Sequence, residues 1–419
     1  MSLFPSDDPI IENHAVLEPD NNSYTPSNLP ERENELAEIN RILRPLQTGG
    51  SPHNALVYGP TGQGKTVAVE LKMQELRTWA DNEGEDVTIV IARCKGCDSS
   101  YHVLTLLVKR LREIKEGRGV ERPQGYPRKA LIEMVFNEID RLGGIVVLVL
   151  DEIDGIGEDD YALYELSRPD ISNAKIGVIG ITNDAQFRNN LDADVQSSLG
   201  QREIFFHPYD ANQLQDILAR RAGRGLVDTS FDGAERTFEN LESDVLDDAT
   251  IPLTAARASN ETGDARQAIR LLRDACEIAE EREELVRERH VKEAHRKIEK
   301  EAHRELIESE TTQRKLALAG VIKHEITGNP NPGTTDIYQT YCAFSKEIDG
   351  RQVSQRTVRA KLNDLAHQNI LTQSRRGRGQ GRGMSNFYSL SIDPELAIEA
   401  LGDDQRLESV AEILWDLGK

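Results

Sequence analysis

The sequence lacks any long hydrophobic run. No segment approaches the ~18 consecutive apolar residues that a membrane-spanning helix requires, and the longest candidate, Ile145–Leu150, has the length of a β-strand. The N-terminal residues are acidic and do not show the basic segment followed by an apolar segment that is typical of a signal peptide. We therefore expect a cytoplasmic protein that does not interact with a membrane.

Cysteine is also scarce, with four residues in the chain. Cys94 and Cys97 form a single CxxC pair, whereas a structural zinc site needs four ligands and usually two such pairs. A redox motif of this type would need a different fold context. We therefore expect Cys94 and Cys97 to be ordinary reduced thiols near the end of a strand.

Lysine contributes 15 of the 51 basic residues, and the formal net charge is −21. A surface rich in acid and poor in lysine resembles that of proteins from a very salty, halophilic cytoplasm; the alternative is an ordinary acidic protein. A strongly acidic protein repels nucleic acid unless its charge is unevenly placed. Between Arg351 and Ile392 there are eight basic residues and one acid, Asp364, so this stretch carries +7 and the rest carries −28.

Short apolar runs separated by helical patterns predict a parallel sheet wrapped by helices. The run at Ile145–Leu150 is continuously apolar, as in a strand buried on both faces. The predicted strands are Ala55–Tyr58, Val87–Ala92, Ile145–Leu150, Ile176–Ile181 and Ile204–Phe206. After Pro208 the pattern is helical throughout, with helices at Gln213–Ala222, Leu253–Thr262 and Ala265–Ala279.

These patterns predict five segments. Residues 1–22 form a disordered acidic tail, 23–208 an α/β base, 209–290 a helical lid, 291–310 a long exposed linker helix, and 311–419 a third, C-terminal domain.

The segment GPTGQGKT has the P-loop pattern, and it follows a predicted strand and opens a predicted helix. Glycines let backbone N–H groups surround phosphate oxygens, the lysine neutralises the β- and γ-phosphates, and the threonine hydroxyl binds Mg²⁺. We therefore expect ATP or ADP to bind with Mg²⁺ at Gly59, Pro60, Thr61, Gly62, Gln63, Gly64, Lys65, Thr66 and Val67.

Acidic and polar residues end two other strands. Asp151 and Glu152 follow the predicted strand at Ile145–Leu150, and the carboxyl edge of such a sheet is where ligands bind. Asp151 is predicted to hold Mg²⁺ and Glu152 to activate the attacking water. Asn183 is predicted to orient that water or sense the γ-phosphate; it could instead form a turn. Arg266, in GDAR, is predicted to reach the γ-phosphate from the lid, although Asp264 could simply cap a helix.

The basic C-terminal stretch contains two predicted helices, Ile337–Lys346 and Val353–Gln368, followed by an Arg/Gly-rich hairpin. This order fits a helix-turn-helix with a wing, and wing arginines can enter a minor groove or bind phosphates. The alternatives are a solvated helix face and a flexible, solubilising loop. The predicted DNA-binding residues are Arg356, Thr357, Arg359, Arg375, Arg376, Arg378 and Arg382.

Together these motifs resemble the archaeal origin-recognition and cell-division-control replication initiators. The resemblance extends from about Ser23 to Ile392 and rests on LPER before the first helix, NALVYGPTGQGKT, VLVLDEID, IGITND, SSLG with FFHPYDANQL, and GDARQAIRLLR. It implies an AAA+ P-loop base with a parallel five-stranded sheet, a helical lid and a winged-helix domain. It also implies nucleotide contacts from Pro30, Arg32, Tyr209, Arg221 and Arg266, and a DNA-contacting insertion within Ser99–Arg128.

One position departs from the family pattern. Asp194 stands where the family usually has a basic residue before the V-x-S-S-L segment, which puts hydrolysis stimulated by a neighbouring subunit in doubt. Arg188 or Arg202 could substitute for that residue.

The leading hypothesis is an initiator that binds double-stranded origin DNA, hydrolyses ATP slowly as a switch, and works with the replicative helicase and other initiator paralogues at the nucleoid. The alternatives are a nucleotide-responsive winged-helix transcription regulator and a helicase-loading adaptor without sequence-specific DNA binding.

Overall fold

The computed structural model describes residues 9–19, 29, 31–117, 119–200, 202–377 and 384–418. The chain divides into two compact units, Met1–Val291 and Lys292–Lys419. The division falls within one long helix, α11 (Glu288–Ser309). Each unit is described by itself.

A five-stranded sheet forms the centre of the base. Its order is β2-β3-β4-β1-β5, and each pair of neighbouring strands is parallel. The strands are β1 (Ala55–Tyr58), β2 (Val87–Arg93), β3 (Gly144–Asp151), β4 (Ala174–Thr182) and β5 (Arg202–Phe205). The predicted parallel five-stranded sheet is therefore confirmed.

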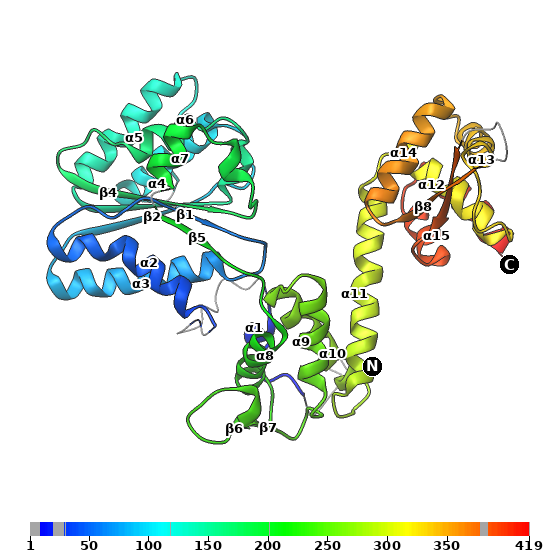
Figure 1. The fold of residues 1–419 in the computed structure, drawn as a ribbon, viewed down its shortest axis with the longest axis horizontal. Coiled ribbons are helices and arrows are strands. Elements are labelled where there is room, and N and C mark those ends of the chain that lie inside the picture. Colours follow the sequence, from blue (N-terminus) through cyan, green and yellow to red (C-terminus); the bar gives the residue numbers. More distant parts are fainter. Residues whose placement is uncertain are drawn as a thin grey trace. The chain divides into compact units, whose positions relative to one another are not determined.

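Helices cover both faces of this sheet, which explains the uninterrupted apolar run in β3. Val146, Leu148 and Leu150 join one hydrophobic cluster, and the alternating residues Ile145 and Val147 join the other. In Figure 1 one face carries α2 (Glu33–Leu43) and α3 (Lys65–Glu83). The opposite face carries α4 (Ser100–Glu116), α5 (Arg128–Leu142), α6 (Tyr161–Ser167) and α7 (Ala193–Leu199).

The lid contains α8 (Ala211–Gly225), α9 (Thr250–Glu261) and α10 (Ala265–Glu280), near the predicted bounds. The expectation of helix throughout was wrong, because β6 (Thr229–Phe231) pairs with β7 (Leu241–Ser243) in an antiparallel hairpin. Phe231 packs so closely on α8 that a Cβ at Gly223 would lie 2.4 Å from its ring. The hairpin strands are only three residues each, too short to give a periodic signal.

Part of the N-terminal segment is structured, so the prediction of disorder for residues 1–22 was wrong for residues 9–19; residues 1–8 and 20–22 lie outside the described residues. Ile11 forms a β-bridge with Leu226, and α1 (His14–Leu17) packs on α8. Ile11 and Leu17 are almost fully buried. Four apolar side chains in an acidic stretch are enough to anchor it because α8 and α10 supply the complementary surface.

The second unit has its own hydrophobic core. It contains α12 (Thr312–Ile326), α13 (Thr334–Glu347), α14 (Gln355–His367), the hairpin of β8 (Leu371–Gly377) and β9 (Met384–Leu390), α15 (Pro394–Gly402) and α16 (Glu408–Gly418). The predicted winged-helix domain is therefore confirmed. Within the described parts of the chain, no helix has the length and apolar character needed to cross a membrane.

Candidate nucleotide site and nucleic-acid interface

The P-loop joins β1 to α3, as its sequence context predicts. Gly59, Gly62 and Gly64 have positive φ angles of 145°, 72° and 83°, which glycine adopts without a steric penalty. At Gly59 a Cβ would lie 2.4 Å from the carbonyl oxygen of Phe206, after β5. Glycine at these positions therefore gives the loop both its backbone turn and its close packing against the base.

Lys65 begins α3 and is buried. Its Nζ donates hydrogen bonds to the carbonyl oxygens of Gly59 (2.8 Å) and Pro60 (2.5 Å), so the ammonium group lies inside the loop. Burial and, to a smaller extent, the nearby charge of Arg266 together lower the pKa of Lys65 to about 8. Arg266 is therefore close enough to influence Lys65 electrostatically, while its predicted role at the γ-phosphate stays a prediction.

Thr66 and Asp151 are 85 positions apart in the chain, and the fold brings them together. The Thr66 hydroxyl lies 3.2 Å from Oδ1 and 3.3 Å from Oδ2 of Asp151. Burial raises the pKa of Asp151, although the hydrogen bond from Thr66 opposes this effect. A buried carboxylate beside a hydroxyl is an all-oxygen donor set of the kind that Mg²⁺ prefers, so these two residues fit the predicted metal.

Two further residues predicted to be catalytic, Glu152 and Asn183, follow the ends of neighbouring strands. Glu152 follows Asp151 directly and adopts a left-handed conformation, with φ 55° and ψ 47°, which is uncommon for a non-glycine residue. Asn183 is exposed immediately after β4, the neighbour of β3 in the sheet. Both therefore lie beyond the carboxyl ends of adjacent strands.

The lid contacts the P-loop through the start of α10. Asp264 caps this helix by accepting hydrogen bonds from the backbone N–H groups of Arg266 and Gln267. A Cβ at Gly62 would lie 1.6 Å from Oδ1 of Asp264, and Ala265 N donates to the Gly62 carbonyl oxygen over 3.3 Å. Asp264 is therefore both a helix cap and the lid residue that packs on the P-loop; the sequence suggested only the first role.

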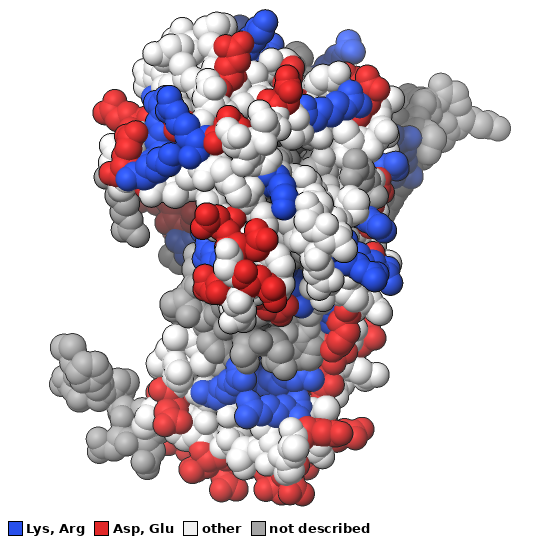
Figure 2. All heavy atoms as spheres, turned by 90° about the vertical axis from the view of Figure 1, so that its left-hand side faces the viewer, with Lys and Arg blue, Asp and Glu red and all other residues white. Residues whose placement is uncertain are grey.

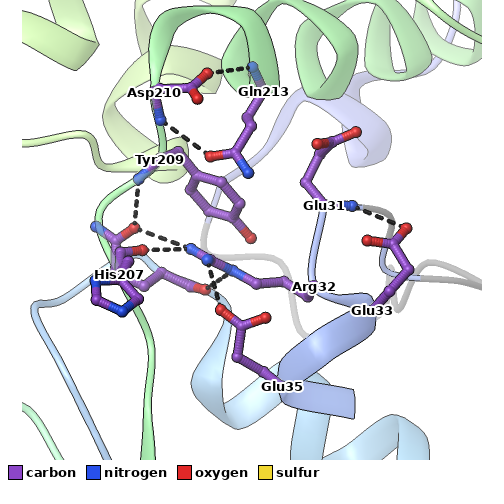
Figure 3. A network of polar contacts seen from close by, with 9 residues as sticks. Glu31, Arg32, Glu33, Glu35, His207, Tyr209, Asp210 and Gln213 are labelled. Atoms are coloured by element: carbon purple, nitrogen blue, oxygen red, sulfur yellow. Dashed lines mark hydrogen bonds and ion pairs between the residues drawn. The ribbon is translucent and has the colours of Figure 1, made fainter. Parts of the chain in front are cut away.

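Arg32 is almost fully buried beside the P-loop (Figure 3). Its guanidinium donates to the carbonyl oxygens of Gln63 (3.1 Å) and His207 (2.7 Å) and to the carboxylate of Glu35 (3.0 Å). It also lies 3.7 Å from the centroid of the Tyr209 ring. Arg32 therefore ties the start of α2 to the P-loop and to the junction between base and lid.

Arg221, also predicted to contact the nucleotide, has a hydrogen-bond partner in the N-terminal segment. Arg221, on α8, donates to the Val16 carbonyl oxygen over 2.6 Å and so contacts the N-terminal helix α1. Pro30 lies outside the described residues. Sequence reasoning missed Glu35 and His207, because a carboxylate on a helix and a backbone carbonyl carry no motif of their own.

Around Asp194, the structure gives partners to the nearby arginines. Arg168 donates to the Asp194 carbonyl oxygen over 2.9 Å, and Arg188 forms an ion pair of 2.6 Å with Glu203. Arg202 is exposed on β5. Among the arginines suggested as substitutes, Arg188 is thus already paired within the chain.

The candidate recognition helix α14 buries Val358, Leu362 and Leu365. Arg356, Thr357 and Arg359 are exposed, on the solvent-facing side of this amphipathic helix. The Thr357 hydroxyl lies 2.9 Å from that of Ser354, the residue that caps the helix. The predicted DNA-binding residues of this helix therefore lie on its accessible side.

The acid in the basic stretch is paired. Arg314 of α12 lies 2.7 Å from the Asp364 carboxylate and 2.9 Å from that of Glu310, so it offsets part of the negative charge at Asp364. The wing joins α14 through the Tyr388 hydroxyl, which donates to Asn363 over 2.7 Å and accepts from Asn386 over 3.2 Å.

Arg375 is exposed on β8. The backbone of Arg376 is in the same strand, whereas Arg378 and Arg382 lie outside the described residues. In contrast, Figure 2 shows basic and acidic side chains interspersed on a face of the first unit, with acids at its lower end. Of the basic residues between Arg351 and Ile392, Arg356, Arg359 and Arg375 are exposed.

A P-loop base, a helical lid that packs on it and a winged helix define a class of protein, the AAA+ ATPases with a DNA-binding domain. Comparisons with known families agree. Residues 28–169 match the AAA ATPase domain, 234–296 the Cdc6 AAA+ ATPase-type lid domain, and 305–400 the CDC6 C-terminal winged helix domain.

The chain belongs to the ORC1-type DNA replication proteins. It is 35% identical to ORC1-type DNA replication protein 1 of Haloarcula marismortui over 96% of this chain and 95% of that protein. It is also 35% identical to the Thermococcus kodakarensis ORC1-type protein, over 95% and 92% of the two chains. Its fold is similar to that of the Aeropyrum pernix ORC1 protein solved in complex with DNA, with a TM-score of 0.76, 32% identity, and coverage of 96% and 99%.

Proposed function

We propose that this protein is an ATP-dependent DNA replication initiator that binds double-stranded origin DNA, helps to recruit the replicative helicase, and uses slow ATP hydrolysis as a switch. The observation that carries the proposal is the convergence of Lys65, Thr66 and Asp151 beneath a lid that contacts the P-loop, in a chain that also has a basic winged helix. The DNA complex of the similar Aeropyrum pernix protein supports the DNA-binding part.

In the proposed site each residue has a separate role. The P-loop amides and Lys65 bind the phosphates. Thr66 and Asp151 hold Mg²⁺, which supplies charge neutralisation at the phosphate oxygens. Glu152 accepts a proton from the attacking water and Asn183 orients that water. Arg266 stabilises the negative charge of the γ-phosphate from the lid.

The lid contact suggests how nucleotide binding changes the rest of the molecule. Asp264 and Ala265 pack on Gly62, so the lid contacts the same loop that would surround the phosphates. A nucleotide that binds one lid position more tightly shifts the population toward that position. In this proposal the nucleotide state sets the lid position, and hydrolysis resets it.

The test is immunoprecipitation of the protein from growing cells followed by sequencing of the bound DNA. A few sharp peaks at non-coding repeats where replication starts are the expected result. Occupancy of many promoters would instead identify a transcription regulator. Helicase loading without sequence-specific binding predicts no peaks, with activity retained after neutralisation of Arg375, Arg376, Arg378 and Arg382.

A further inference from the structure

The CxxC pair lies directly against the proposed metal ligand. Cys94 follows β2, and its backbone N–H donates a 2.7 Å hydrogen bond to the carbonyl oxygen of Asp151. Residues Arg93 and Asp151 are also paired in the register of β2 and β3. A shift of the Cys94 backbone should therefore also shift the backbone of Asp151.

The two cysteines are held in a tight turn. Cys97 N donates to the Cys94 carbonyl oxygen over 2.7 Å, the i to i+3 bond of a β-turn, in which the end Cα atoms lie less than about 7 Å apart. Disulfides bridge Cα atoms separated by about 4.4–6.8 Å. Lys95 and Gly96 between them are exposed, and Gly96 has a φ of 78°. Both cysteines are free thiols in this structure, and the Cα separation of a β-turn overlaps the range that a disulfide can bridge.

The turn also packs on the segment that follows Glu152. A Cβ at Gly155 would lie 2.8 Å from the Cys97 carbonyl oxygen, and both cysteines share a hydrophobic cluster with Ile153 and Ile156. A change in the shape of the turn would therefore affect Asp151, which precedes Glu152, and Gly155, which follows it. A hydrogen bond from Cys94 lowers the pKa of the Cys97 thiol, which favours Cys97 as the nucleophile.

We infer that Cys94 and Cys97 form a reversible redox site whose disulfide displaces Asp151 and weakens binding of the magnesium–nucleotide complex. The inference rests on the proposed role of Asp151 at the metal. The oxidant is a small-molecule disulfide. The Cys97 thiolate attacks one of its sulfurs and expels one thiolate. Cys94 then loses its proton, attacks the Cys97 sulfur and expels the bound half, so that two protein thiols are oxidised and the small disulfide is reduced to two thiols.

The experiment treats the full-length protein with hydroxyethyl disulfide or with dithiothreitol. Free thiols are counted, and the Cys94–Cys97 peptide is examined by mass spectrometry. ATP binding is measured with Mg²⁺ and with EDTA. We expect oxidation to form the Cys94–Cys97 disulfide and to weaken binding of MgATP by about tenfold or more, the effect typical of disturbing the support of a metal ligand. Binding in EDTA should change less than about twofold, and dithiothreitol should reverse the effect.

Two variants serve as controls. Cys97→Ser should bind MgATP like the reduced protein and lose the response to oxidant, whereas Cys342→Ser, at a partly exposed thiol in the second unit, should keep it. Failure of the disulfide to form under oxidant overturns the inference, as does a disulfide that leaves MgATP binding unchanged. If the reduced protein binds no ATP, the proposed function fails, while the mass of the Cys94–Cys97 peptide still decides whether the redox site exists.

Discussion

Gly62 shows how a single residue can control the contact between base and lid. Its φ of 72° strains any other residue, and an added Cβ would lie 1.6 Å from the Asp264 carboxylate. Gly49 has nearly the same φ, 76°, but nothing lies within 4 Å of the position that a Cβ would take there. A substitution at Gly49 therefore tests backbone strain alone, whereas the same substitution at Gly62 tests backbone strain together with a steric clash with the lid.

We expect Gly49→Ala to destabilise the protein by about 1–2 kcal/mol, the typical penalty of the left-handed conformation. Gly62→Ala should have a larger effect on unfolding and should also change lid opening, because Asp264 must move away from the P-loop. Chemical denaturation and limited proteolysis of the lid would measure both. Equal effects of the two substitutions would show that the contact with Asp264 contributes nothing to the free energy of unfolding.

Lys65 provides a second test at the residue scale. Removing its buried ammonium group should weaken ATP binding by about 3 kcal/mol, or roughly a hundredfold, because a charge-assisted contact to phosphate is lost. Calorimetric titration of Lys65→Ala with ATP measures this change. Lys72→Ala is the matched control, since this lysine lies in the same helix and pairs with Glu75. Similar losses in both variants would argue against a specific role for Lys65.

At the scale of elements, the N-terminal segment binds to the lid through hydrogen bonds and an ion pair. The backbone N–H groups of Glu12 and Asn13 donate to the Gly225 carbonyl oxygen (2.9 and 3.1 Å), and Val227 N donates to the Ile10 carbonyl oxygen (3.1 Å). Arg273 forms an ion pair of 2.8 Å with Glu18. These contacts fix residues 9–18 to α8 and α10.

Ile11→Asp should therefore destabilise the lid by about 2–4 kcal/mol, because it places an unpaired carboxylate at a buried apolar position. Hydrogen exchange in α8 and α10 would report the loss locally. Glu12→Gln, at the exposed neighbouring position, should leave the exchange unchanged. Unaltered protection in Ile11→Asp would show that the lid folds without this segment.

The elements also show where sequence reasoning succeeds. The strands β1 and β3 were predictable because their apolar runs are followed by the P-loop pattern and by the pair Asp151 and Glu152, so that the hydrophobic pattern and the motif agree. The hairpin of β6 and β7 was not, since its six residues gain their order from contacts with α8 such as Phe231 on Gly223. The contact between Asp264 and Gly62 joins residues 202 positions apart, and neither residue type reveals it.

In the winged helix, one hydroxyl connects two elements. Tyr388→Phe removes the group that links Asn363 of α14 to Asn386 of β9. Leaving these amides without their shared partner should cost about 1–3 kcal/mol, seen as a lower midpoint of thermal unfolding. Tyr126→Phe, at an exposed position, should have no such effect. A midpoint unchanged by Tyr388→Phe would mean that the hydrogen bonds do not stabilise this domain.

For the whole molecule, the proposed function raises the question of how a chain with a net charge of −21 would bind a polyanion. In the second unit, Asp364 is ion-paired and the arginines of α14 are exposed, so positive side chains are available at this helix. Each phosphate contact releases counterions, so the logarithm of DNA affinity should fall linearly with the logarithm of salt concentration, with a slope of about −0.9 per contact.

Replacement of Arg356 and Arg359 by alanine should therefore weaken DNA binding and make the salt slope shallower by about 1 for each arginine that contacts a phosphate. Titrations of duplex DNA at several salt concentrations measure the slope. Arg41→Ala removes a positive charge from an exposed position of α2 and should leave the slope unchanged. If affinity falls and the slope stays constant, these arginines contact base edges instead of phosphates. They would then contribute to sequence specificity and not to the salt-dependent part of the affinity. If Arg41→Ala has the same effect, binding depends on net charge and α14 is not the DNA-binding helix.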